Sequence, residues 1–152
     1  MKMKRSNIYL TLAALLMCLT GVLTSCDIET SGNGKLDGYW HMTAVDTIAT
    51  GGTADLSQKR LFWGVQHKLI NLSDRDNLAY NIWMRFEHSA SILRLYEPYY
   101  NNRNEGDPVL EDAEKLEPFG LEGLEQSFKV EELKGKKMTL STDKLRIHFE
   151  KL

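Results

Sequence analysis

The sequence predicts an all-β fold, an antiparallel β-barrel interrupted by one short helical or irregular excursion, with a β-sandwich as the alternative. Several short segments of the 152-residue chain alternate apolar and polar residues with period two, as half-buried strands do. Short polar turns such as Lys134-Gly135-Lys136 separate these segments. Beyond residue 25 no segment is apolar for eighteen residues, so we expect no membrane-spanning helix there.

The first 25 residues have the pattern of an export signal. Basic residues within the first five positions precede an apolar run at residues 8–22. This run of about fifteen residues is shorter than the twenty or so that a spanning helix needs. It is followed by Leu23-Thr24-Ser25-Cys26, which resembles the lipobox of bacterial lipoproteins. The resemblance implies a signal peptide over residues 1–25 and cleavage before Cys26.

In lipoproteins of this type the cysteine carries acyl chains such as palmitate. The resemblance therefore implies a bacterial envelope protein whose partner is a membrane, which holds it through lipid on Cys26. Asp27 resembles a signal that retains lipoproteins at the inner membrane, whereas Asp27 and Glu29 together resemble a surface-export signal. The inner membrane, the outer membrane and the cell surface stay open as locations.

Composition narrows the classes of partner. Loss of the signal removes three basic residues and no acid from the 19 Lys+Arg and 21 Asp+Glu, which leaves a net charge of −5. This sign argues against nucleic acid as a partner, and equally against binding to anionic lipid through protein charge. Cys18 leaves with the signal and Cys26 is expected to carry lipid, so no disulfide remains. We expect a flexible polar tether at residues 26–35 and one β domain at residues 36–152.

The strands follow one another along this domain. A first strand is predicted at about residues 38–47, where Trp40, Met42 and Ala44 share one face. A second is predicted at residues 61–69 and a third at residues 80–88. Shorter strands are expected at residues 92–97, 128–130, 138–140 and 145–149.

Residues 101–126 do not alternate in this way. They are rich in Asn, Glu, Asp and Gly, and we expect a short helix after Pro108 at residues 109–116 and another helical turn at 121–126. Excursions of this length between strands are often functional. We expect this one to cover one end of the barrel as a lid, with its acidic residues forming a solvated face.

Gly38-Tyr39-Trp40, at the entry to the first strand, resembles the Gly-x-Trp signature of lipocalins and their calycin relatives. The resemblance implies an eight-stranded barrel in which the glycine permits a tight bend and the tryptophan plugs the closed end. It also implies a basic residue that packs across the tryptophan from near the last strand. Arg146 is the expected residue, with Lys144 as the second choice.

Motifs of enzyme chemistry are not found. The chain has no Gly-x-Ser-x-Gly elbow, phosphate-binding glycine loop or His-Glu-x-x-His zinc helix. The four histidines lie on separate predicted strands without metal-ligand spacing. We therefore expect a non-catalytic protein without a catalytic residue, metal site or cofactor.

Two hypotheses of function remain. In the first, the barrel binds a small apolar or amphipathic ligand, lined by residues of the second and third strands: Trp63, Val65, Tyr80, Ile82, Met84 and Phe86. In the second, the core is filled, as small barrels often are, and the protein is a structural or interaction scaffold. Its surface for an envelope protein partner would include Tyr96, Tyr99 and Tyr100.

Overall fold

The computed structural model describes residues 31–77 and 81–152, a unit that begins at Ser31. The predicted signal peptide and Cys26 lie outside the described residues. No helix in the described part of the chain is long and apolar enough to cross a membrane. The elements, in chain order, are η1 (Gly34–Leu36), β1 (Gly38–Thr47), β2 (Gly52–Asp55), β3 (Leu61–Gln66), β4 (Leu69–Asp74), β5 (Asn81–His88), β6 (Ile92–Tyr100), η2 (Arg103–Glu105), η3 (Ala113–Phe119), β7 (Gln126–Lys134), β8 (Lys137–Ser141) and β9 (Leu145–Lys151).

Eight antiparallel strands close into a barrel. The sheet order is β2-β1-β3-β4-β5-β6-β7-β8-β9, and β1 also pairs with β9, while β2 pairs only with β1. At the closure Trp40 lies opposite Lys151 and Thr47 opposite Leu145. Pairing of the first and last barrel strands removes the free edges that an open sandwich would expose. The predicted barrel is therefore confirmed and the sandwich is not formed.

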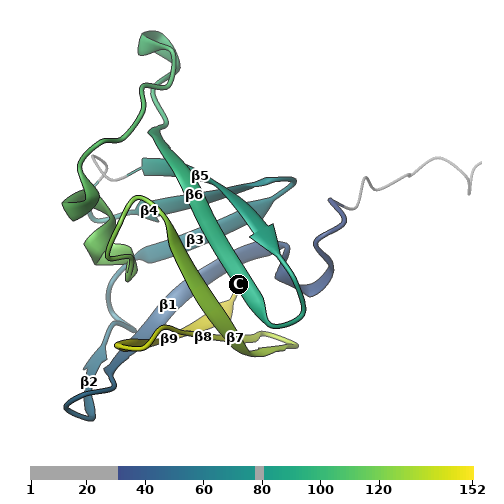
Figure 1. The fold of residues 1–152 in the computed structure, drawn as a ribbon, viewed down its shortest axis with the longest axis vertical. Helices are drawn as coiled ribbons and strands as arrows, with labels where there is room; N and C mark the ends of the chain where they lie inside the picture. Colours follow the sequence, from purple (N-terminus) through teal and green to yellow (C-terminus); the bar gives the residue numbers. More distant parts are fainter. Residues whose placement is uncertain (1–30, 78–80) are drawn as a thin grey trace, which may run out of the picture. The chain divides into compact units, whose positions relative to one another are not determined.

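The barrel has two different ends (Figure 1). One end holds η1, the turns at residues 67–68, 89–91 and 135–136, and the last residues of β9, and we call it the closed end. We call open end the one that holds the β1–β2 turn, residues 101–125 and the turn at 142–144. In Figure 1 the 3-10 helices η2 and η3 lie at the left, with the open end, and η1 lies at the right.

The prediction of one continuous strand over residues 61–69 is wrong, because the chain turns after residue 66 and residue 69 begins the next strand of a hairpin. β3 ends at Gln66 and β4 starts at Leu69, and His67 in the turn between them has φ 54°. The inward residues change phase across this turn: Val65 of β3 pairs with Ile70 of β4. The short strand β2, which is exposed along its length, was not predicted. It has no buried face and so no alternation to detect.

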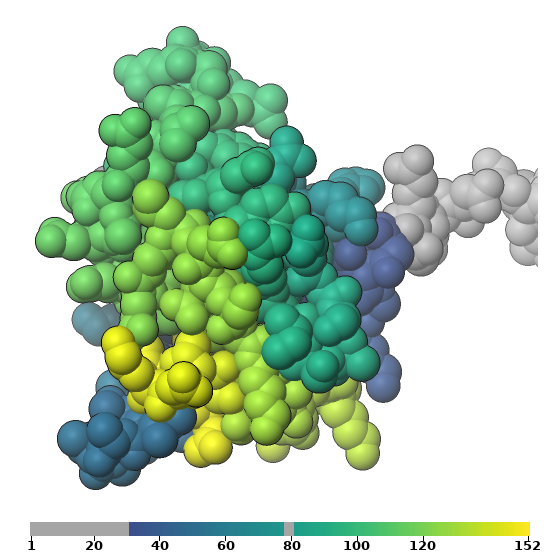
Figure 2. All heavy atoms as spheres, in the orientation of Figure 1, coloured from purple at the N-terminus to yellow at the C-terminus, as the bar shows by residue number. Residues whose placement is uncertain are grey.

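Apolar side chains from all eight barrel strands fill the interior. From outside, the green residues of the 101–125 segment lie against the strands at the upper left of Figure 2. The alternation along each strand places one set of residues inward, and the largest of them have no exposed surface. Among these are Trp40, Trp63, Phe128, Met42, Met84 and Leu95. Dispersion contacts and the removal of this apolar surface from water stabilise the barrel.

Candidate functional site

The closed end is plugged around the Gly-x-Trp segment. The indole Nε1 of Trp40 donates a hydrogen bond of 2.8 Å to the carbonyl of Leu36, and this bond holds η1 at the closed end of the barrel. The ammonium of Lys151 lies 4.7 Å from the centre of the Trp40 ring and donates to the Lys35 carbonyl at 3.0 Å. Gly38 has φ 126°, and a Cβ there would lie 2.7 Å from Cε of Lys151. Only glycine leaves this path free without backbone strain.

We expected Arg146 to be the basic residue that packs over Trp40, but that residue is Lys151. Arg146 lies on the outer face of β9, where its Nε donates to Glu131 at 2.7 Å. This contact, followed by the one from the Ser141 hydroxyl at 2.9 Å, lowers the pKa of Glu131. The Glu131 carboxylate in turn raises the pKa of Arg146. Because β9 runs antiparallel to β1, its last residue and not its second one lies opposite Trp40.

A second polar pair lies on the outer wall where β1 meets β9. Nε2 of His148 donates to the Asp46 carboxylate at 2.8 Å, and the Thr53 hydroxyl donates to the same carboxylate at 2.7 Å. These two hydrogen bonds lower the pKa of Asp46, and the one from His148 has the larger effect. The described ranges contain no group of three His, Cys, Asp or Glu side chains that could hold a metal ion.

The residues that we expected to line a ligand site share the barrel interior. Ile82 and Met84 have no exposed surface, and Val65 and Phe86 are each 4% exposed. Trp63 is fully buried as well, and its ring meets those of Phe128 and Phe149 edge-on, with centroids 5.7 and 5.0 Å apart. Side chains of opposite walls therefore touch at the level of Trp63. Tyr80, the sixth residue of the set, lies outside the described residues.

Trp63 differs from Trp40 in one respect. Its indole N–H is buried and has no hydrogen-bond partner among the described residues. An unpaired donor inside an apolar core destabilises a protein by about 1–3 kcal/mol, and native structures contain few of them. A group that accepts a hydrogen bond at this point of the interior would remove the penalty.

The excursion closes the open end of the barrel, as expected of a lid. Leu116, Phe119 and Leu121 are buried in the same cluster as the strand residues. Gly120, with φ 81°, lies so close to the inward residue Ile147 that a Cβ would overlap the Cδ1 of Ile147. Residues 101–125 therefore seal the barrel mouth with apolar side chains of their own.

Few backbone bonds hold this lid. The Asn101 amide at its start donates to the Asn81 carbonyl at 3.0 Å, and an isolated bridge between Tyr99 and Val109 joins its first half to β6. Glu122 pairs with Lys144 at 3.1 Å and Glu125 with Arg94 at 2.8 Å, and all four side chains are more than one-third exposed. Such exposed pairs contribute about 0–1 kcal/mol each. The lid is therefore held mainly by its apolar contacts, and a segment with few backbone bonds to the strands is suited to local opening.

The predicted secondary structure of the lid was partly wrong. The helix expected at residues 109–116 is the 3-10 helix Ala113–Phe119, with the Asp112 side chain accepting from the Glu114 amide. The helical turn expected at residues 121–126 is not formed, because residues 122–125 are bends and β7 starts at Gln126. Gly120 adopts the left-handed conformation and ends η3.

The three tyrosines of the expected partner surface do not share one environment. Tyr96 lies on the outer face, where the Arg94 guanidinium is 4.8 Å from its ring centre. Tyr99 pairs with Trp83 on the neighbouring strand, and both are half-buried. Tyr100 instead packs against the barrel core. The outer aromatic surface thus includes Trp83, which the sequence reasoning had not assigned to it.

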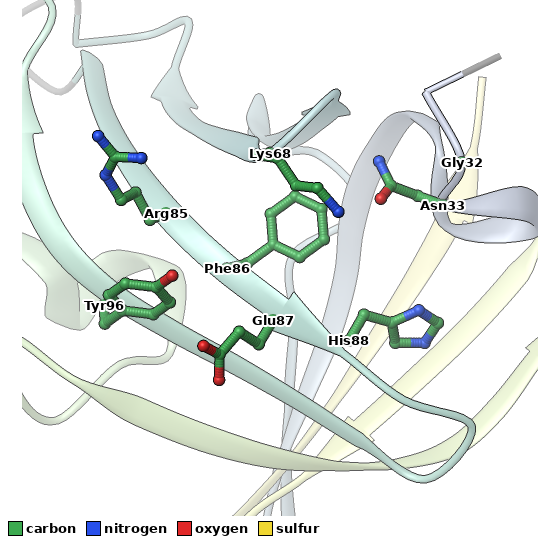
Figure 3. Close-up of a pocket in the computed structure, with 8 residues that line it drawn as sticks. All are labelled: Gly32, Asn33, Lys68, Arg85, Phe86, Glu87, His88 and Tyr96. Atoms are coloured by element: carbon green, nitrogen blue, oxygen red, sulfur yellow. The ribbon is translucent and has the colours of Figure 1, made fainter.

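Residues 31–35, expected to belong to the flexible tether, lie on the barrel. The side-chain amide of Asn33 donates to Asp37 at 2.8 Å and to the His67 carbonyl at 2.6 Å. Beside it opens a surface pocket of about 430 Å³ (Figure 3). Lys68, Arg85 and His88 surround the ring of Phe86 in this pocket. Burial lowers the pKa of His88, which favours its neutral form.

Comparison with known proteins agrees with this architecture. Residues 20–152 match the model of the lipocalin-like domain family. A lipocalin-like protein from Bacteroides uniformis has a similar structure, with TM-score 0.60 and 17% identity over 78% of this chain and 100% of that one. An uncharacterized protein from Bacteroides eggerthii gives TM-score 0.56 and 21% identity over 76% of this chain and 98% of that one. No curated protein matches the chain significantly. Because the family model covers most of the sequence, the chain belongs to the lipocalin-like domain family.

Proposed function

We propose that this protein is a non-catalytic binding module, lipid-anchored in the bacterial envelope, which holds a small apolar or amphipathic ligand inside its barrel. The observation that carries the proposal is the buried indole N–H of Trp63, which has no hydrogen-bond partner in residues 31–77 and 81–152. An apolar interior with one fixed donor suits a ligand that has a hydrocarbon body and one oxygen acceptor, such as a carboxylate, ester or hydroxyl group. Fatty acids are the simplest ligands of this class.

Entry of a ligand requires the barrel to open and repack, because side chains fill it in this conformation. The lid supplies the opening, since few backbone bonds hold residues 101–125 to the strands. Met42, Met84 and Met138 supply the repacking, because the unbranched methionine side chain adapts to irregular space. A ligand would then take the place of lid side chains such as Phe119.

A titration of the mature chain, residues 26–152, with fatty acids of increasing length tests this proposal. We expect saturable changes in tryptophan fluorescence and a raised melting temperature with palmitate. Trp63→Phe removes the donor and should weaken binding about tenfold, the equivalent of one hydrogen bond. Trp83→Phe, on the outer wall, is the matched control and should leave the affinity unchanged. Unchanged fluorescence and melting temperature across the whole panel would refute the proposal.

The anchor has its own test. Metabolic labelling with an alkyne analogue of palmitate should mark the protein at Cys26 and leave the Cys26→Ser variant unmarked. The unmodified variant should also leave the membrane fraction, because several acyl chains are needed for firm attachment. Equal membrane recovery of the two proteins would show that the cysteine is not the anchor.

The filled interior favours a second candidate, an interaction scaffold. In this reading the core is permanently occupied and the outer aromatic surface around Tyr96, Tyr99 and Trp83 binds an envelope protein. A photo-crosslinker at position 99 in native membranes should then capture one dominant protein. Crosslinking without a dominant product, together with fatty acid binding, would remove this candidate.

A further inference from the structure

Charge is divided between the two ends of the barrel. The lid at the open end is acidic, with Arg103 and Lys115 as its basic residues against Glu105, Asp107, Glu111, Asp112, Glu114, Glu117, Glu122 and Glu125. At the closed end lysines outnumber acids. The lysines are Lys35, Lys68, Lys134, Lys136, Lys137 and Lys151, and the acids are Asp37, Glu87, Glu132 and Glu150.

These lysines come from separate turns that the fold brings together. The amide of Lys151 donates to the Lys136 carbonyl at 2.8 Å, which joins the β7–β8 turn to the end of β9. The Lys151 ammonium reaches the Lys35 carbonyl, and Asn33 reaches the carbonyl of His67, next to Lys68. The lysine-bearing turns therefore form one continuous surface, which we call the basic face.

The charges of the basic face are available to a partner. Across residues 31–77 and 81–152 the ion pairs involve none of the five exposed lysines of this face, Lys35, Lys68, Lys134, Lys136 and Lys137. The pocket beside Asn33 adds a concave site next to them, which is lined by Lys68 and Arg85 together with Phe86 (Figure 3). Arg85 is already paired with Glu97 at 2.8 Å, so Lys68 is the available cation of the pocket.

The chain leaves the barrel at this same end. Ser31 follows Cys26 by five positions, and an extended chain spans at most about 3.6 Å per residue. Ser31, at the end of the barrel that carries the basic face, can therefore lie no farther than about 18 Å from a lipid on Cys26. Each cation near an anionic leaflet is attracted by its surface potential, and the attraction falls off within about 8 Å at physiological salt.

We propose that the basic face docks on the anionic phospholipid headgroups of the leaflet that holds the anchor, and so directs the open end away from the membrane. The proposal rests on the proposed lipid anchor for its distance argument. It departs from our expectation that protein charge would not favour anionic lipid, because that expectation used the average charge of the chain and the proposal uses the charge of one face. The acidic lid adds to the orientation, since the same leaflet repels it.

The docking face is tested on vesicles to which residues 26–152 are coupled through Cys26 and a maleimide lipid. Both solved relatives are matched over 98–100% of their chains, so a barrel of this extent folds without further domains. The coupling replaces the natural anchor, so failure here counts against the basic face and not against lipidation. Lysines are then acetylated and mapped by mass spectrometry on vesicles with and without 30% phosphatidylglycerol.

We expect severalfold protection of Lys35, Lys68, Lys134, Lys136 and Lys137 on phosphatidylglycerol and none at Lys59 or Lys144 of the open end. The protection should disappear in 1 M salt. Equal labelling on both kinds of vesicle would overturn the proposal. Protection that is independent of phosphatidylglycerol but rises with protein density would also overturn it, because it would indicate a second copy of the chain on this face.

A charge-matched pair of variants completes the test without any anchor. In the Cys26→Ser chain, replacing Lys134, Lys136 and Lys137 with Gln should weaken sedimentation with phosphatidylglycerol vesicles by roughly ten- to a hundredfold. Replacing Lys59, Arg60 and Arg103 with Gln removes the same charge from the open end and should change binding less than twofold. Equal losses for the two variants would show that net charge, and not the basic face, determines binding.

Discussion

Replacement of Gly120 with alanine tests whether the lid is seated on the barrel. The left-handed backbone at Gly120 (φ 81°) disfavours a Cβ by about 1 kcal/mol. That Cβ would also overlap Cδ1 of the fully buried Ile147, and overpacking of a core typically destabilises by about 1–3 kcal/mol. Gly120→Ala should therefore lower the free energy of unfolding by about 2–4 kcal/mol.

Two comparisons isolate the contact from the backbone strain. Gly135 also has a positive φ, 59°, but a Cβ there meets nothing within 4 Å, so Gly135→Ala should lose only about 1 kcal/mol. Ile147→Val removes Cδ1 and should partly rescue Gly120→Ala, with a coupling energy of about 1 kcal/mol in a double-mutant cycle. Urea unfolding followed by tryptophan fluorescence gives all four values. If the losses of unfolding free energy caused by Gly120→Ala and Gly135→Ala differ by less than about 0.5 kcal/mol, Gly120 is not packed against Ile147 and the lid does not close the barrel.

The remaining predictions concern the plug and the outer wall. Lys151→Met should lower the free energy of unfolding, measured in urea, by about 0.5–1.5 kcal/mol, because it removes the cation over Trp40 and the hydrogen bond to the Lys35 carbonyl. Lys137→Met is the control and should have almost no effect in the same assay. Trp40→Phe should lose about 1–3 kcal/mol in the same assay, because the Leu36 carbonyl loses its donor; a neutral result would contradict the plug. Glu131→Gln should destabilise by about 0.5–1 kcal/mol at pH 7. The folded-state pKa of Glu131 is lowered, so its contribution is complete above the unfolded pKa and is lost as pH falls through the folded one. The difference between wild type and variant should therefore vanish in urea titrations near pH 2, and a constant difference would assign it to packing.

Alternation along single strands was sufficient to predict the barrel, because burial of one face repeats every second residue. This worked for β5, where Ile82 and Met84 point inward, and for the first half of β1, where Trp40 and Met42 do. The register of β1 shifts after Met42, so that Val45 and not the expected Ala44 packs against the core. It failed at the β3–β4 turn, although the sequence contains a signal there. Inward residues change from odd to even positions between Val65 and Ile70, and a continuous strand cannot do this.

The site was less predictable, because its essential features depend on contacts between distant segments. Lys151 reaches Trp40 only through the register of β9 on β1, which no local pattern specifies. Phe119 is buried by the barrel mouth and not by a periodic face of its own helix. The Trp63 indole N–H lacks a hydrogen-bond partner in the described residues because no acceptor lies near it in the core, and only the three-dimensional structure reveals this.

The most direct test of ligand binding in the barrel is the NMR signal of the Trp63 indole N–H. The chain has three tryptophans, so specific 15N labelling gives three indole resonances. Trp40 already donates to Leu36, and Trp83 lies on the outer wall, so these two serve as internal references. On titration with palmitate, we predict a saturable downfield shift of the Trp63 proton as it gains an acceptor, with small changes at the other two. A Trp63 resonance that stays in place throughout the titration would contradict an internal ligand site.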